Sequence, residues 1–322
     1  MDQLINLNDK DLAVLKDTAR FRSLSLESIS LVHFGGSTYA WKRLGKLYKH
    51  GYVDRKYYYT VEKMPGGTEH TRRVAAFYYP TLKGLNAIGY TIDPRYVQPD
   101  SRKLDLHYMV SQLYSNIPGL LAKREAQGKY GLKNFMPVTC VVPSQPPVYI
   151  CITGKNKSHG EANRLIKFID IKYFSGTYIA VSHQFPGKKL LLTNSHFIPW
   201  NLAQEVIPRM VKDKDAYIND FLSYADRLFK GIQVLEKEER FIKVQTASHG
   251  IYNLAEIFTG STRLMLLLRN PPPRTFVYCE NPKHLQGFKL ESGSFIFFSR
   301  KENKIYELFM EGGKTKHRLL SK

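Results

Sequence analysis

The stretch that decides the fold of the N-terminal part is STYAWKRLGKLYKHGYVDRKYYYT, residues 37–60. A helix from about residue 38 to 50, drawn at about 100° per residue, gathers four side chains on one apolar side: Ala40, Leu44, Leu47 and Tyr48. Gly51 follows in the position where a left-handed residue often ends a helix. The next run, YVDRKYYYTV, is rich in Tyr and Val and favours a strand. The stretch therefore predicts an amphipathic helix followed directly by a strand.

The other side of this helix carries the candidate binding residues. Thr38, Tyr39, Lys42, Lys46 and Lys49 point outward there, while Trp41 and Arg43 flank the apolar side. An exposed lysine taken alone is a solubilising charge, but four basic residues on one such helix favour contact with DNA. Lysine suits phosphate as a point charge, whereas arginine and polar side chains discriminate bases better. We therefore expect the lysines and Arg43 to meet DNA, with Thr38, Tyr39 and Arg43 as base readers.

The flanking segments extend this pattern in both directions. Two helices are predicted before it, over 8–21 with Asn8 as N-cap and over 25–34 with Ser25 as N-cap. After it come a polar turn at 65–67, a second strand over 74–81 and a short helix over 81–90. Three helices, a hairpin and a helix in this order are typical of a winged helix. Its third helix enters the major groove and its hairpin, the wing, lies on phosphate, where we expect Arg72 and Arg73 to contact the DNA backbone.

These residues also resemble a known family, the plasmid replication-relaxation family of Gram-positive bacteria and their mobile elements. The matching motifs are DLAVL at 11–15, RFRSLSLESI at 20–29, RLGKLYKHGY at 43–52 and YPTLKG at 79–84. The resemblance covers about residues 8–90, and its motifs are shared with many winged-helix repressors. It implies site-specific binding of double-stranded DNA in replication or relaxation of a plasmid or other mobile element, with replication or relaxosome proteins as partners. A transcriptional repressor with the same DNA-binding mode is the alternative.

Charge supports a polyanionic partner. The chain has 322 residues, and 48 Lys and Arg against 28 Asp and Glu give a net charge of +20, spread along the sequence. Such a surplus favours nucleic acid or an anionic membrane, although a basic protein with no such partner is the plain alternative. The longest apolar run, LMLLL at 264–268, is far shorter than the ~20 residues of a membrane-spanning helix. We therefore expect a cytoplasmic DNA-binding protein with no membrane partner.

The whole chain is predicted to be α+β. We assign residues 1–92 to a winged helix-turn-helix domain, 93–134 to a linker and connecting helix, and 135–322 to a larger α+β domain with a mixed sheet. That last domain is expected to serve in assembly or further backbone contact. Within it we predict one long helix over 215–239 and a strand over 263–269. The long helix is either core or the interface of a homodimer, which palindromic winged-helix sites favour.

Catalysis is the competing interpretation. The replication-relaxation family usually carries a nuclease-like region, which needs paired carboxylates for Mg²⁺ and a lysine. The nearest match is FIDIKY, with Asp170 and Lys172, and its upstream partner would be Asp105 or Glu161. Three-residue patterns of this kind arise by chance in so basic a chain, so the fold, if nuclease-like, is a degraded copy. We expect a non-catalytic protein with no cofactor and no metal; the widely spaced Cys140, Cys151 and Cys279 give neither a disulfide framework nor a zinc site.

Overall fold

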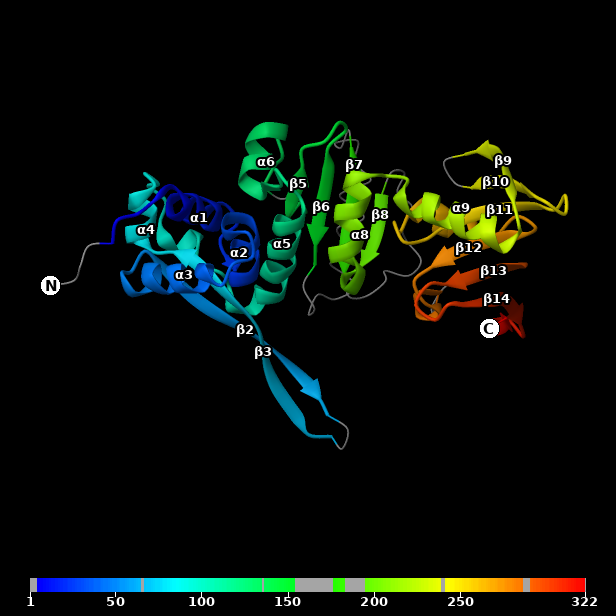
Figure 1. The fold of residues 1–322 in the computed structure, drawn as a ribbon, viewed down its shortest axis with the longest axis horizontal. Coiled ribbons are helices and arrows are strands. Elements are labelled where there is room, and N and C mark those ends of the chain that lie inside the picture. Colours follow the sequence, from blue (N-terminus) through cyan, green and yellow to red (C-terminus); the bar gives the residue numbers. More distant parts are fainter. Residues whose placement is uncertain are drawn as a thin grey trace. The chain divides into compact units, whose positions relative to one another are not determined.

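The computed structural model describes residues 5–64, 67–134, 136–153, 176–182, 195–238, 241–285 and 290–321. N-terminal helices with a small antiparallel sheet are followed by two mixed sheets with helices (Figure 1). The chain divides into two compact units. The first comprises the described residues up to 144 together with 149–153, and the second comprises 145–148 and the described residues from 176 onward.

The first ninety residues contain the predicted order of helices and strands. The elements are α1 (Asp9–Arg20), β1 (Leu24–Ser25), α2 (Leu26–Phe34), α3 (Tyr39–Lys49), β2 (Val53–Lys63), β3 (Glu69–Pro80) and α4 (Leu82–Ala87). Asn8 caps α1 in a reciprocal capping box with Asp11, and Ser25 caps α2, as predicted. The two-residue strand β1 was not predicted, because its partner on β3 lies about fifty residues away in sequence. The turn predicted at 65–67 lies mostly outside the described residues.

The core of this region follows the apolar side of α3. Ala40, Leu44 and Leu47 are buried as predicted, but Tyr48 was predicted to pack inward and is instead 37% exposed. Gly84 shows how tightly α4 closes on the end of α3: a Cβ there would lie 2.1 Å from the backbone oxygen of Tyr52. No side chain fits so close to a backbone atom, so this position requires glycine.

The remainder of the first unit packs on these elements. It contains η1 (Pro94–Tyr96), η2 (Ser101–Lys103), α5 (Leu104–Asn116), β4 (Leu121–Ala122), α6 (Lys123–Tyr130), β5 (Cys140–Val142) and β6 (Val148–Ile152). Helix α5 contacts α2 and β1: the Ser111 hydroxyl accepts a hydrogen bond from the Ser25 backbone N–H at 2.8 Å. The ring of His107 lies 3.1 Å from the Ser23 hydroxyl. The segment predicted as a connecting helix therefore contributes to the same core as the N-terminal helices.

The second unit is built on a seven-stranded sheet. Its elements are β7 (Thr177–Ser182), β8 (Ser195–Pro199), α8 (Trp200–Lys212), α9 (Ala216–Leu228), β9 (Ile232–Lys237), β10 (Ile242–Thr246), β11 (Ile251–Glu256), α10 (Thr262–Leu267), β12 (Thr275–Cys279), η3 (Pro282–Leu285), β13 (Ser294–Ser299), β14 (Lys304–Glu311) and β15 (Lys314–Ser321). The strand order is β15–β14–β13–β12–β11–β10–β9, with β11, β12 and β13 parallel and the outer pairs antiparallel. Strands β7 and β8 of this unit pair in parallel.

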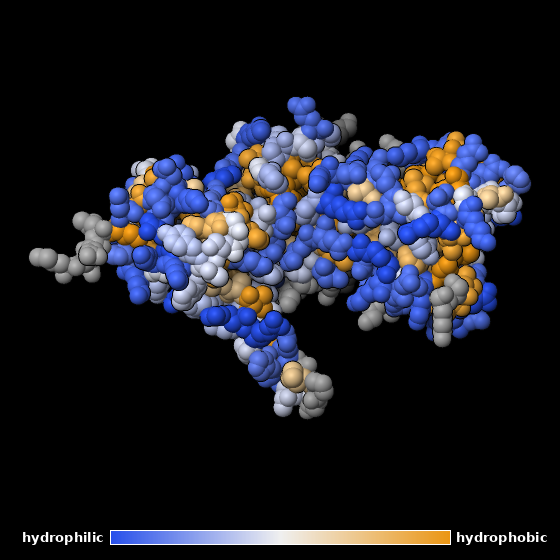
Figure 2. Space-filling view, viewed as in Figure 1, coloured by the Kyte–Doolittle hydropathy of each residue, from blue (hydrophilic) through white to orange (hydrophobic). Residues whose placement is uncertain are grey.

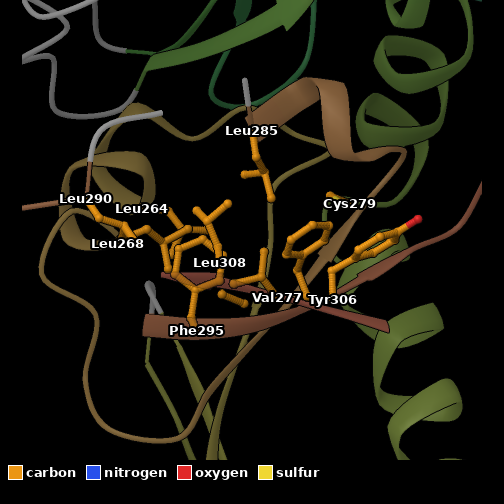
Figure 3. Close-up of a cluster of buried hydrophobic side chains, with 11 residues drawn as sticks. Leu264, Leu268, Val277, Cys279, Leu285, Leu290, Phe295, Tyr306 and Leu308 are labelled. Carbon is orange, nitrogen blue, oxygen red and sulfur yellow. The ribbon is translucent and has the colours of Figure 1, made fainter. Parts of the chain in front are cut away.

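Alternating side chains cover the two faces of the seven-stranded sheet. On β12, Phe276 and Tyr278 contact Phe221 of α9 at ring-centroid distances of 5.1 and 5.0 Å. Val277 and Cys279 point to the opposite face (Figure 3), where they join a cluster with Leu264 and Leu268 from α10 and the residue after it. Successive residues of a strand face opposite sides, so β12 is buried on both faces, between α9 and α10.

Two predictions for this unit are wrong. The helix predicted over 215–239 ends at Leu228, because Lys230 and Gly231 adopt positive φ and the chain turns into β9. Residues 263–269, predicted as a strand, contribute most of α10, whose N-terminus is capped by the Ser261 hydroxyl. A short apolar run such as LMLLL has no period that separates a buried helix from a buried strand.

Candidate nucleic-acid interface

The outer face of α3 presents unpaired positive charge. Lys42, Lys46 and Lys49 are exposed, and among the described residues none of them forms an ion pair with a carboxylate. The side chain of Thr38 makes no capping hydrogen bond, and the Ser37 hydroxyl accepts one from the Tyr39 backbone N–H. This face can therefore meet an anion without first breaking a bond inside the protein.

Aromatic rings lie among these lysines. Tyr39 is 51% exposed and Trp41 is 63% exposed, although both are large and partly apolar. One turn beyond Trp41, Gly45 has open space where a side chain would be. Exposed aromatic side chains next to lysines suit contact with base edges and thymine methyl groups.

Arg43 has a different role from the one predicted. Its Nε donates to Asp11 Oδ1 at 2.8 Å, and its Nη2 donates to Asp11 Oδ2 and, at 2.9 Å, to the backbone oxygen of Asn6. Asp11 is fully buried, and the Arg43 side chain is only 11% exposed. The bidentate pair ties α3 to α1, so the guanidinium is not available to read a base.

The hairpin of β2 and β3 continues the surface of α3 through stacked arginines and tyrosines. The Arg55 guanidinium lies 4.4 Å from the ring centroid of Tyr48 on α3 and 5.4 Å from that of Tyr57. On the paired strand, the guanidinium of Arg73 lies 5.1 Å from the Tyr57 centroid. A guanidinium stacks readily on aromatic faces, and Arg55 also forms a side-chain hydrogen bond with Tyr78. We call Tyr48, Arg55, Tyr57 and Arg73 the Arg–Tyr ladder.

The outer half of the hairpin extends away from the helices of the first unit (Figure 1). Hydrophilic residues cover most of its visible surface (Figure 2). Arg72 is on this part, 68% exposed, and lies 3.7 Å from Glu62 of the paired strand. A pair so exposed contributes little and can be exchanged for phosphate. Both hairpin arginines named from the sequence are thus exposed, but only Arg73 belongs to the ladder.

Sequence reasoning did not select Trp41 or Arg55. Trp41 was assigned to the flank of the apolar side, although tryptophan at an exposed helix position is itself a signal for binding. Within the run VDRKYYYT, the composition predicts a strand but does not single out Arg55 as a binding residue. The alternation of Arg55, Tyr57 and Tyr59 on one side of a strand would have indicated a common face.

The predicted nuclease residues are not brought together by anything that the structure describes. Asp170, Lys172 and Glu161 lie outside the described residues. Asp105 is on α5, where its carboxylate accepts a hydrogen bond from the backbone N–H of Leu106 at 2.8 Å. The described part of the chain holds no group of three His, Cys, Asp or Glu side chains placed to bind a metal ion. The three cysteines are buried free thiols, and no described helix has the length and apolar character needed to cross a membrane.

Comparison of the chain with protein-family models, curated proteins and solved structures found no match. The resemblance to the replication-relaxation family therefore stays a prediction from the sequence motifs. Any function assigned to α3 and the hairpin has to rest on their own geometry and charge.

Proposed function

We propose that residues 5–92 form a winged-helix domain that binds double-stranded DNA at a specific site, without catalysis. Helix α3 enters the major groove, and the hairpin of β2 and β3 acts as the wing along the phosphate backbone. The order of the elements supports this interpretation: β1 pairs with β3 beside β2, and α1, α2 and α3 pack on the small sheet.

One observation carries the proposal. Lys42, Lys46 and Lys49 stand unpaired on the exposed face of α3, and the Arg–Tyr ladder joins that face to the hairpin. Two separate elements thus present basic side chains, and they meet where Arg55 of β2 stacks on Tyr48 of α3. The one arginine of α3, Arg43, is held in the fold by Asp11, so the basic side chains left on the exposed face of α3 are lysines, which suit phosphate.

Site selection then falls to the polar and aromatic residues of α3. Thr38, Tyr39 and Trp41 are exposed near the start of the helix, the part that meets base edges in helix-turn-helix proteins. Lysines along the helix fix its register on the phosphates but carry no sequence information. We therefore assign positioning to Lys42, Lys46 and Lys49, and base reading to these three residues.

We place this activity in the replication or relaxation of a bacterial plasmid or other mobile element, acting as a homodimer together with replication or relaxosome proteins. The motifs shared with the replication-relaxation family support that role. A transcriptional repressor would use the same surface and differs only in where its site lies. An origin or transfer region favours the first role, and a promoter favours the second.

Duplex binding is the decisive experiment. The full-length protein is to be titrated against labelled duplex fragments of its source replicon, with and without Mg²⁺, and the protected site is to be mapped. We expect saturable, salt-sensitive binding of one or a few fragments, and intact DNA after incubation with Mg²⁺. Failure to bind any duplex at low salt would refute the DNA-binding role, and specific cleavage would refute the non-catalytic one.

A further inference from the structure

The second unit has a cavity of about 660 Å³ between α9 and the sheet. Its aromatic wall is formed by Tyr224 of α9, Tyr278 of β12 and Phe298 of β13. Polar side chains line the rest, among them Asp220, Arg227 and Asn303. The volume falls within the range of about 300–1,000 Å³ found for small-ligand sites. None of the residues assigned to duplex binding lines this cavity.

The aromatic wall is a stack of nearly parallel rings. Tyr224 lies on Phe298 with centroids 3.9 Å apart and planes at 15°. Phe298 is 5.9 Å from Tyr278 at 5°, and Tyr278 is 5.0 Å from Phe221 at 9°. The inner rings are buried, whereas Tyr224 is only partly buried. A flat ligand that stacks on Tyr224 would therefore extend a series of rings that the fold already holds parallel.

Most of the charges at the cavity are already paired. Arg209 binds Asp220 at 2.5 Å through one carboxylate oxygen. Arg300 binds Glu205 at 2.7 Å and Glu280 at 2.9 Å. These contacts neutralise Asp220 and Arg300, which line the cavity, and leave little net charge there.

Arg227 differs from Arg300, which also lines the cavity. It is exposed, and its Nε donates only to the backbone oxygen of Ser223, at 3.3 Å. Among the described residues no carboxylate pairs with it. It follows Tyr224 by three positions on α9, so its guanidinium and the Tyr224 ring share one face of the helix. The cavity thus offers a stacking surface next to a free cation.

We propose that this cavity binds an unpaired nucleotide, with the base stacked on Tyr224 and the phosphate bound by Arg227. The Asn303 amide and the second carboxylate oxygen of Asp220 are the groups at hand for the hydrogen-bonding edge of the base. Nucleic-acid channels for single strands combine aromatic stacking with a cationic contact to the backbone in the same way. The inference goes beyond duplex binding by α3 and does not depend on it, because it rests only on residues of the second unit.

Single-stranded probes test the proposal in the full-length protein. Labelled strands of about 12 nucleotides, within the site sizes of single-strand binders, are titrated in the presence of excess unlabelled duplex, which occupies the α3 surface if that surface binds DNA. Tyr224→Leu keeps an apolar side chain against Phe298 but removes the ring, whereas Tyr224→Phe keeps the ring. Arg227→Ala removes the free cation, and Lys212→Ala removes one exposed charge from α8 as the matched control.

We expect Tyr224→Leu to weaken single-strand binding about 10-fold and Tyr224→Phe to leave it unchanged. Arg227→Ala should weaken it about 10-fold and lower the salt slope by about 0.7, with no such effect of Lys212→Ala. Displacement by free nucleoside monophosphates would identify a free nucleotide as the ligand, and displacement by strands alone would identify a nucleotide within a strand. Equal binding by the wild type, Tyr224→Leu and Arg227→Ala would overturn the proposal. If the wild-type protein binds single strands but no duplex, that result would instead count against the winged-helix role.

Discussion

The exposed lysines of α3 give the sharpest test of the proposed duplex interface. Replacing Lys42, Lys46 and Lys49 together with Ala removes three unpaired charges but no buried contact. Alanine is also the best helix former, so α3 should persist and stability should change by no more than about 0.5 kcal/mol. Each phosphate contact contributes about 0.9 to the slope of log affinity against log salt on B-DNA. The triple variant should therefore lose about 2.7 units of slope.

That difference is large enough to measure directly. A slope change of about 2.7 units over a fourfold change in salt corresponds to about 40-fold in affinity. Between about 50 and 200 mM salt, wild-type binding should therefore weaken about 40-fold more than binding by the variant, as followed by fluorescence anisotropy on a duplex. The control removes Lys16, Lys129 and Lys133, which are exposed and lie outside α3 and the hairpin. Equal slopes for the two triple variants would refute the assignment of α3 to DNA.

Three further predictions concern Arg43, Arg55 and His107. Arg43→Ala should cost about 3 kcal/mol in urea denaturation, because it leaves the buried Asp11 carboxylate without its partner, and should keep duplex affinity within about twofold; a large loss of affinity in the folded variant would restore Arg43 to the interface. Arg55→Ala should lower the salt slope by about 0.9 and weaken unrelated duplexes equally, so a loss confined to one sequence would contradict a backbone role. Burial lowers the pKa of His107 from 6.5 to about 4. The unfolded chain therefore binds more protons between these values, and the free energy of unfolding should fall by up to about 3 kcal/mol as the pH drops from 6.5 to 4. His107→Gln should flatten this dependence in denaturation at several pH values, and an unchanged slope would show that another group causes it.

The N-terminal elements could be predicted because local signals mark their ends. Asn8, Ser25 and Thr81 each cap a helix through their own side chains, and Gly51 has the positive φ expected after α3. Such signals act over a few residues and are readable from sequence. The short strand β1 pairs with a distant partner on β3, and its own two residues carry no strand signal that could be read from the sequence.

The candidate site was harder to predict than the helices that carry it. Lys42, Lys46 and Lys49 could be placed outward from periodicity alone. Arg43 could not, because its position on the wheel is intermediate and its partner Asp11 comes from another helix. The Arg–Tyr ladder likewise depends on which strand residues face α3, and that is set by tertiary packing. In the second unit, α9 ends earlier than predicted because Lys230 adopts a positive φ, a conformation rare for lysine.

The packing of α5 has a consequence for how this protein can be divided. The ring of Tyr108 lies 6.0 Å from that of Tyr58 on the hairpin. From α6, Glu125 binds Arg20 of α1 through both carboxylate oxygens, at 2.6 and 2.9 Å. A polypeptide cut after residue 92 would expose the surfaces that these residues cover. The smallest portable piece therefore extends at least through α6.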